Sequence, residues 1–288
     1  DYTSTIDRYN NQQKHLWDYY EGMTVGEVWG YVTEGFFTSP EDVKSHADQS
    51  LYYASNSKKW LPGDIKFKDL NNDGVINYGT NKVDDPGDRK VIGNTTPRYT
   101  YSIHLGADWN GLFVSAFFQG VGKQDWWPGT DNALFWGQYN RPYNNIPRSM
   151  LGEIWSEENP NTYFPRYRGY TALQGTRELS VVQTRYLQNV AYLRLKNVQI
   201  GYNFPKRLTG KVRMQQARIY LSAENLWTWS PLYKRTKNFD VATIYGEDVE
   251  AKDMVNAAGG TNSIIQGGGK SYSYPLLKSV SLGLSVTF

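Results

Sequence analysis

The stretch SVSLGLSVTF, residues 279–288, carries the alternation that decides the fold. Its large apolar side chains occupy every second position: Val280, Leu282, Leu284, Val286 and Phe288. Serine, glycine and threonine fill the positions between them. Successive side chains of an extended strand point to opposite faces, so this spacing predicts a β-strand with one apolar face and one small, polar face.

The same period of two recurs upstream in two adjacent runs, residues 99–109 and 112–120. In the first run, aromatic and aliphatic residues at the odd positions share one face, and small or polar residues share the other. Asn110 and Gly111 lie between the runs, and Asn-Gly is the dipeptide favoured in two-residue hairpin turns. We therefore expect an antiparallel hairpin here.

A second pair of runs covers residues 192–204 and 212–225. The apolar phase of the first run changes near Lys196 and Asn197, which predicts a β-bulge at that point. A weaker run at residues 25–36 brings the expected number of strands to about six. The chain is therefore predicted to be all-β.

The connections between these runs alternate in length. The turns at 110–111 and 205–211 are short, whereas residues 37–98, 121–191 and 227–278 form long polar connections rich in Gly, Asn, Asp and Pro. Transmembrane antiparallel β-barrels alternate short periplasmic turns with long extracellular loops, and their strands have ~9–11 residues. We expect such a barrel. Six strands would leave two edges without hydrogen-bond partners in lipid, so sequence outside this chain should complete it.

Two other protein classes remain open on this pattern. A soluble, aromatic-rich β-sandwich that binds carbohydrate also has alternating strands, but it buries its apolar faces between two sheets. An adhesin or a purely structural barrel without cargo would share the barrel pattern. Small neutral residues on the polar faces and three very long connections favour the transmembrane barrel.

The composition excludes several further functions. The 288 residues have a net charge of +3 without a Lys/Arg block, so we expect no nucleic-acid partner. Mean hydropathy is −0.63, and no apolar run has the length of a transmembrane helix. There is no cysteine and no recognisable catalytic or phosphate-binding motif, which predicts a protein that is not an enzyme and has no organic cofactor. The first residues lack a basic-then-apolar leader, as in a mature protein or a fragment.

Six segments, in order, resemble the SusC/RagA family of TonB-dependent outer-membrane transporters. They are EGMTVGEVWGYVTEGFF (21–37), GDIKFKDLNNDGVI (63–76), VIGNTTPRY (91–99), YLRLKNVQIGYNFP (192–205), ARIYLSAENLWTW (217–229) and YPLLKSVSLGLSVTF (274–288). Each segment alone is a modest signal, but their common order is specific and spans nearly the whole chain.

The resemblance implies a 22-stranded barrel in the outer membrane of a Gram-negative bacterium, of which residues 1–288 would be the C-terminal part. It also implies import of glycans or peptides with a SusD-like surface lipoprotein, energised by the TonB complex. The family's N-terminal plug and TonB box are absent from this sequence. The terminal Phe288 matches the aromatic C-terminus that outer-membrane barrels present to their assembly machinery.

The segment Asp69-Leu-Asn-Asn-Asp-Gly-Val-Ile76 has the spacing that begins an EF-hand-like calcium loop. Asp69, Asn71 and Asp73 would supply side-chain oxygens, and Val75 its backbone carbonyl. Thr80 stands where an EF-hand has glutamate, so Asp84, Asp85 or Asp88 would have to substitute. The sequence predicts a structural Ca²⁺ here, and the alternative is a turn stabilised by its own Asp and Asn side chains.

Aromatic residues mark two further sets of candidates. Trp126, Trp127, Trp136 and Tyr139 cluster in the second long connection, where they would contact substrate or partner or, alternatively, form the core of the loop. Tyr99, Trp109 and Phe288 lie at the ends of predicted strands. Barrels carry aromatic girdles at both membrane interfaces, so we expect these three in a girdle facing outer-membrane lipid.

Overall fold

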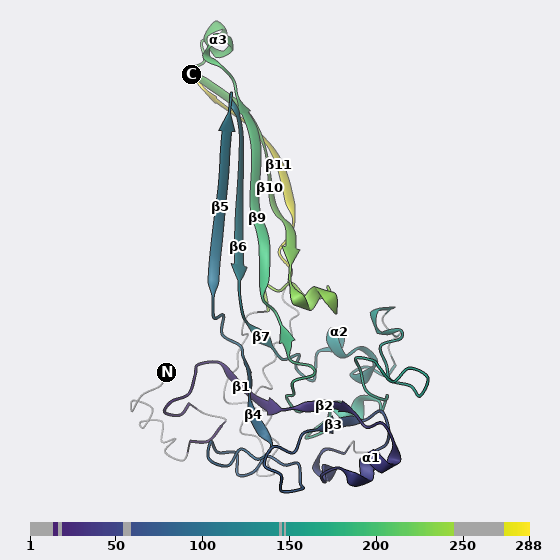
Figure 1. Ribbon diagram of the computed structural model, residues 1–288. Coiled ribbons are helices and arrows are strands. Elements are labelled where there is room, and N and C mark those ends of the chain that lie inside the picture. Colours follow the sequence, from purple (N-terminus) through teal and green to yellow (C-terminus); the bar gives the residue numbers. More distant parts are fainter. Residues whose placement is uncertain (1–13, 17–18, 54–58, 144–145, 147, 245–273) are drawn as a thin grey trace. The chain divides into compact units, whose positions relative to one another are not determined.

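The computed structural model describes residues 14–16, 19–53, 59–143, 146, 148–244 and 274–288 (Figure 1). These residues form two compact units. Unit 1 comprises the described residues of the segments Asp1–Thr96, Asp125–Gln188 and Ile244–Tyr272, and unit 2 those of Pro97–Gln124, Asn189–Thr243 and Ser273–Phe288. Each unit therefore combines segments that are distant in sequence.

Unit 2 is built on one antiparallel sheet of five strands in the order β11-β10-β9-β6-β5 (Figure 1). The strands are β5 (Thr100–Trp109), β6 (Leu112–Val121), β9 (Tyr192–Asn203), β10 (Gln216–Trp229) and β11 (Ser279–Thr287). Each pairs with its predecessor among these five, and the β6–β9 pairing spans the long connection between them. The five strands with the clearest alternation are confirmed, as is the all-β class.

The turn between β5 and β6 has the predicted form. Trp109 pairs with Leu112, and the two residues between them both have positive φ, 47° at Asn110 and 91° at Gly111. A two-residue hairpin turn of this type favours Asn and Gly, because other residues are strained there. The β9–β10 connection contains α3 (Lys206–Thr209) and the 3₁₀ turn η6 (Gly210–Val212), and η7 (Pro231–Lys234) follows β10.

The predicted bulge in β9 is confirmed. Phe117 of β6 pairs with Asn197, but the next residue, Phe118, pairs with Leu195, so Lys196 is an extra residue. On the other side of β9 the register also shifts, between Glu224 and Trp227 of β10. The bulges return the apolar side chains beyond them to one common face. They also show that β10 continues past the predicted end at residue 225.

Unit 1 contains short elements. Its strands form small antiparallel pairs, β1 (Glu27–Tyr31) with β4 (Arg89–Asn94) and β2 (Thr33–Phe36) with β3 (Ile65–Phe67). Two strands of two residues each, β7 (Asp125–Trp126) and β8 (Gln188–Asn189), lie where the chain passes between the units. The helices and 3₁₀ turns are α1 (Pro40–Ser45), η2 (Ser50–Tyr52), α2 (Ala133–Trp136), η3 (Gly137–Tyr139), η4 (Arg148–Met150) and η5 (Tyr170–Leu173). No helix in the described part of the chain is long and apolar enough to cross a membrane.

The expected sixth long strand at residues 25–36 was predicted wrongly. The segment divides into β1 and β2, which belong to separate small sheets. Val28 and Tyr31, on opposite faces of an extended strand, are both buried, and Tyr31 N donates to Val182 O at 2.9 Å. The segment is therefore enclosed within unit 1 instead of presenting one apolar face.

Residues from two of the long connections, together with Tyr31 of β1, form two aromatic clusters in unit 1. In the first, Tyr31, Tyr52 and Phe67 meet with ring centroids 5.1–5.6 Å apart. In the second, Trp136 contacts Tyr186 at 5.1 Å, and Phe164 stacks on Tyr186 at 5.9 Å. Large buried rings of this kind allow segments with little regular structure to form a core. Of the third connection, residues 245–273 lie outside the described residues.

Candidate functional site

One face of the five-stranded sheet is apolar, continuous and exposed; we call it the apolar face. Its central rows follow from the registers of the four strand pairs. The first row is Ala107, Val114, Ile200, Leu221 and Leu282, and the next is Leu105, Ala116, Val198, Ala223 and Val280. Leu282 is 74% exposed and Val280 64% exposed. Among the residues that the structure describes, no layer of unit 2 covers these side chains.

Aromatic residues lie at both ends of the apolar face. Trp109, Leu112 and Tyr202 begin the row at the hairpin end, and Trp227 and Trp229 share the rows of Ile103 and Tyr101 at the opposite end. The distance along β5 from Tyr101 to Trp109 is ~27 Å at ~3.4 Å per residue. This length is close to the ~25 Å apolar band of outer-membrane barrels, whose flanks are aromatic.

The three predicted girdle residues are all exposed, with fractions of 66% for Tyr99, 78% for Trp109 and 77% for Phe288. Trp109 lies on the apolar face, and Tyr99 and Phe288 flank β5 and β11. Their contact with lipid stays a prediction. Trp227 and Trp229, about half exposed, extend the same aromatic border. The sequence pattern missed their phase, because the bulge in β10 shifts it.

The opposite, polar face of the sheet carries small and hydrogen-bonding residues. Ser115, Gln199, Ser222 and Ser281 form its central row, and His104 lies within 2.9 Å of Ser115 Oγ. All charged side chains at paired strand positions also lie on this polar face; they are Asp108, Arg194, Arg218 and Glu224. The sheet therefore separates charge from apolar surface completely at its paired positions.

Glycines on the polar face accommodate aromatic rings. Gly201 pairs with Phe113 on one side and with Tyr220 on the other, and Tyr220 pairs with Gly283. A Cβ at Gly201 would lie 2.6 Å from the Phe113 ring, and one at Gly283 would lie 2.2 Å from the Tyr220 ring. The rings occupy the space above the backbone of the paired glycines, where a side chain would otherwise stand.

The predicted calcium loop folds as a turn held by its own side chains. Asp69 accepts hydrogen bonds from Asn72 N at 2.6 Å and Gly74 N at 2.9 Å, and Asp73 accepts from Val75 N at 2.8 Å. Asn71 Oδ1 accepts from Asp73 N at 3.1 Å. Asn72 and Gly74 have φ of 60° and 82°, which closes the turn sharply. The turn therefore uses the side-chain oxygens of Asp69, Asn71 and Asp73 as acceptors for its own N–H groups.

Asp88 is the buried acid beside this turn. It accepts hydrogen bonds from Leu70 N and Asn77 N, both at 2.8 Å. Burial raises the pKa of Asp88, and the charges of Asp69 and Asp73 act in the same direction. Asp84 is exposed in the following turn. Within the described ranges, no group of three or more His, Cys, Asp or Glu residues is gathered to hold a metal ion, so a site here would also need Asn71 and the Val75 carbonyl.

The aromatic residues predicted to contact a substrate or partner are buried in unit 1. Trp126, Trp127, Trp136 and Tyr139 are at most 4% exposed, and Trp136 Nε1 donates to Gly129 O at 3.0 Å. This arrangement matches the alternative that the rings form the loop's core. Contact with a ligand stays a prediction and would require that core to open.

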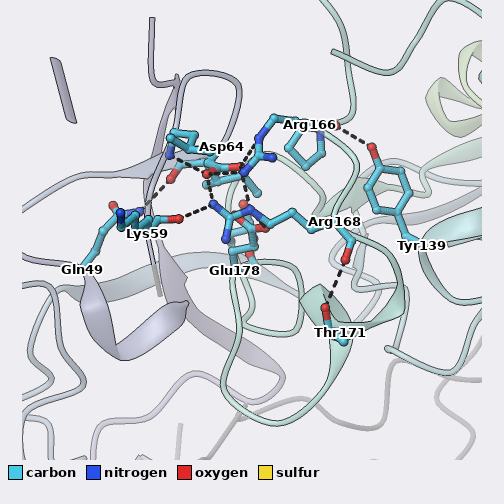
Figure 2. Close-up of polar contacts among 12 residues, drawn as sticks. Gln49, Lys59, Asp64, Tyr139, Arg166, Arg168, Thr171 and Glu178 are labelled. Carbon is cyan, nitrogen blue, oxygen red and sulfur yellow. Dashed lines mark hydrogen bonds and ion pairs between the residues drawn. The ribbon is translucent and has the colours of Figure 1, made fainter. Parts of the chain in front are cut away.

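A charged cluster that the sequence did not indicate lies in unit 1: Asp64, Arg166, Arg168 and Glu178 (Figure 2). The fully buried Asp64 carboxylate accepts from Arg166 Nε at 3.2 Å and from Arg168 Nε at 2.9 Å, and it also pairs with Arg168 Nη2. Leu61 N adds a further bond at 2.8 Å. One carboxylate thus holds two arginines against the segment 61–64.

Glu178 is the second acid of the cluster, and unlike Asp64 it makes no close ion pair with an arginine in the described part of the chain. Its carboxylate is fully buried and lies 3.7 Å from Arg168 Nε, beyond hydrogen-bond distance. Burial raises the pKa of Glu178 to about 8, and the charge of Asp64 adds to this rise. Both effects favour the neutral form of Glu178, beside an aspartate that is paired with two arginines.

No protein-family model matches the chain. Two curated relatives from Formosa agariphila do. TonB-dependent receptor P3 is 27% identical over 273 residues, which is 93% of this chain and 22% of that protein. TonB-dependent receptor P26 is 26% identical over 226 residues, which is 78% of this chain and 20% of that protein. The chain thus spans about a fifth of the length of these relatives.

Among solved structures, the RagAB peptide transporter aligns with a TM-score of 0.46 and 22% identity, covering 71% of this chain and 19% of that one. The RagAB peptide importer in its closed-closed state aligns with a TM-score of 0.41 and 21% identity over 70% of this chain and 19% of that one. The resemblance to TonB-dependent transporters carried by the six sequence segments is confirmed by the curated relatives.

Proposed function

We propose that this chain supplies C-terminal strands to a large, 22-stranded barrel that imports nutrients through the outer membrane of a Gram-negative bacterium. The single observation that carries the proposal is the exposed apolar face of the five-stranded sheet, bordered by aromatic residues at both ends. A soluble protein rarely exposes an apolar surface of this extent, whereas a bilayer requires one.

The connections support an orientation for this barrel. The β5–β6 turn and the α3–η6 connection join strands at one end of the sheet, and the long connections leave from the other end. Short turns face the periplasm in barrels of this kind. We place residues 37–98, 121–191 and 227–278 outside the cell on this basis.

The edges of the sheet support a larger assembly. Within the described residues, β5 and β11 each pair on one side only. An unpaired strand edge in a bilayer leaves several backbone groups unsatisfied, at several kcal/mol each. The remainder of the barrel would pair with both edges, in agreement with the small share of the curated relatives that this chain spans.

The soluble β-sandwich is the competing function. It requires a second sheet or another layer over the apolar face, and in the part of unit 2 that the structure describes no such layer is present. The proposal therefore favours the importer, with a SusD-like lipoprotein and the TonB complex as partners, as the family resemblance implies. The proposed cargo is a glycan or a peptide.

The intact protein that contains this chain tests the proposal directly. We expect it in the outer-membrane fraction, soluble only with detergent, and with faster gel migration before boiling than after. Deleting its gene should abolish growth on the cargo, tested separately with oligosaccharides and with oligopeptides as the sole carbon source. A protein that stays monomeric in buffer without detergent would refute the barrel. A barrel whose deletion affects neither source would refute the import.

The calcium loop is a second element of the proposal. We propose that Asp69, Asn71, Asp73 and the Val75 carbonyl bind Ca²⁺, with Asp84 or Asp88 completing the oxygen ligands. A divalent cation would offset the mutual repulsion that contributes to the raised pKa of Asp88. Its role would be to hold the turn and not to react.

We expect titration of the calcium-depleted intact protein with Ca²⁺ to release heat, and Asp73→Ala to abolish that heat. The turn keeps its Asp69 hydrogen bonds in this variant, so the fold should survive. Glu157→Ala, an exposed acid of another segment, is the matched control and should bind as the parent does. Identical heats from the Asp73→Ala and parent proteins would rule out the site.

A further inference from the structure

Unit 2 contains a pocket of about 470 Å³ at the end of β10 from which η7 continues. Its lining includes Arg194 of β9, Tyr233 of η7, Lys237, Asp240 and Lys278. Sites for small ligands commonly have volumes of ~300–1,000 Å³ and combine apolar walls with a few convergent polar groups. The pocket has both the size and the mixed lining of such a site.

A buried ion pair forms the floor of this arrangement. Arg194 donates from Nε to Thr228 Oγ1 at 2.8 Å and from Nη2 to Asp240 Oδ1. Asp240 also accepts from Ala242 N at 3.0 Å and from Leu276 N at 2.9 Å. Burial by itself would raise the pKa of Asp240, but these hydrogen bonds hold it below the ordinary value. The one acid in the lining is therefore ionised, and both of its carboxylate oxygens already accept hydrogen bonds.

The positively charged side chains of the lining, in contrast, retain donors without hydrogen-bond or ion-pair partners among the described residues. The Arg194 side chain is 5% exposed, and its Nη1 is buried without a hydrogen-bond partner among the described residues. Lys237 and Lys278 are exposed, and the described part of the chain shows no ion pair for either. With Asp240 paired to Arg194, the lining keeps an excess of two positive charges from the lysines.

We infer that this pocket binds the anionic group of a ligand, a carboxylate or a sulfate, whose carbon skeleton packs against Tyr233. Cations that lack partners near a buried, unpartnered guanidinium nitrogen favour an oxyanion, because each N–H can then donate to a charged acceptor. The aromatic ring of Tyr233 at the same pocket supplies apolar contact for a sugar ring or a peptide chain. The ligand chemistry is common to acidic glycans and to peptides with a free C-terminus.

Anion binding follows from the shape and charge of the pocket and does not depend on the proposed function, which would make the ligand part of the imported cargo. Binding is best measured by calorimetry with the intact, detergent-purified protein at low ionic strength. One arm compares trigalacturonate with neutral trigalactose, and the other compares trialanine with its C-terminal amide. We expect the charged probe to bind in at least one arm and its neutral partner to bind much more weakly. The arm that responds identifies the source of the anion.

Two variants assign the binding to this pocket. The double substitution Lys237→Gln with Lys278→Gln should lower the affinity about tenfold and weaken its dependence on salt. Lys234→Gln removes an exposed lysine of η7 that does not line the pocket, and it should bind as the parent does. Failure of both charged probes to bind, or equal affinity in the double variant, would overturn the inference. Normal anion binding in a protein that imports nothing would count against the proposed function alone.

Discussion

Arginine in place of Val280 is expected to remove most of the protein from the outer membrane. Val280 lies in the central row of the apolar face and is 64% exposed there. An arginine at the midplane of a bilayer costs a β-barrel ~2–4 kcal/mol, and the long side chain has furthest to reach toward water from the middle of the sheet. The measurement is the amount of folded, heat-modifiable protein in outer membranes relative to the parent.

Ser281→Arg provides the matched control for this experiment. Ser281 is the next residue of β11 and pairs with Ser222 on the polar face. An arginine there would lie on the polar side of the barrel wall and keep its water, so we expect nearly normal recovery. The two variants differ only in the face that receives the charge. Equal recovery of both, whether high or low, would contradict the assignment of the apolar face to lipid.

The five strands of unit 2 were predictable because each strand keeps one apolar side and one polar side along its whole length. A strand with one apolar and one polar side shows period two directly in its sequence, and β11 shows it without interruption. The bulge near Lys196 was equally visible, as a change of phase. The matching bulge in β10 was not, because Asn225 and Leu226 interrupt the pattern among residues that resemble a strand end.

Unit 1 was less predictable because its contacts join distant segments. Trp136 is fully buried, and two of the rings that pack beside it, Phe164 and Tyr186, come from distant segments that nothing near Trp136 in the sequence indicates. Local composition does not distinguish an aromatic residue that awaits a ligand from one inside a core. The charged cluster was missed for the same reason, since Asp64 and Arg168 are 104 residues apart.

Asparagine in place of Asp64 is expected to lower the free energy of local opening of unit 1 by ~3–5 kcal/mol, the usual cost of removing one partner of a buried ion pair. The amide retains the shape of the side chain but leaves Arg166 and Arg168 without their shared carboxylate (Figure 2). Hydrogen exchange of residues 63–67 and 166–180 in the intact protein measures the change. Strand amides of the five-stranded sheet should keep the exchange rates of the parent.

Glu178→Gln makes the same acid-to-amide change in the same cluster, and we expect the opposite result. The pKa of Glu178 is raised to about 8 in the folded chain, against an ordinary value of 4.5, so between these values folding retains a proton that the unfolded chain loses. Parent stability should therefore fall as the pH rises through this window, and Glu178→Gln should abolish that part of the fall while matching the parent at the low-pH end.

The double variant shows whether the two acids act on the same arginines. In Asp64→Asn, the charge that helps to raise the pKa of Glu178 is gone, and Glu178 lies 3.7 Å from Arg168 Nε. It should then ionise and partly replace the lost carboxylate, so adding Glu178→Gln to Asp64→Asn should destabilise unit 1 further. Additive effects of the two substitutions would show that Glu178 stays neutral in the presence and in the absence of the Asp64 charge.

For the single variant, exchange rates that Asp64→Asn leaves unchanged would mean that the charged cluster does not hold residues 166–168 against segment 61–64.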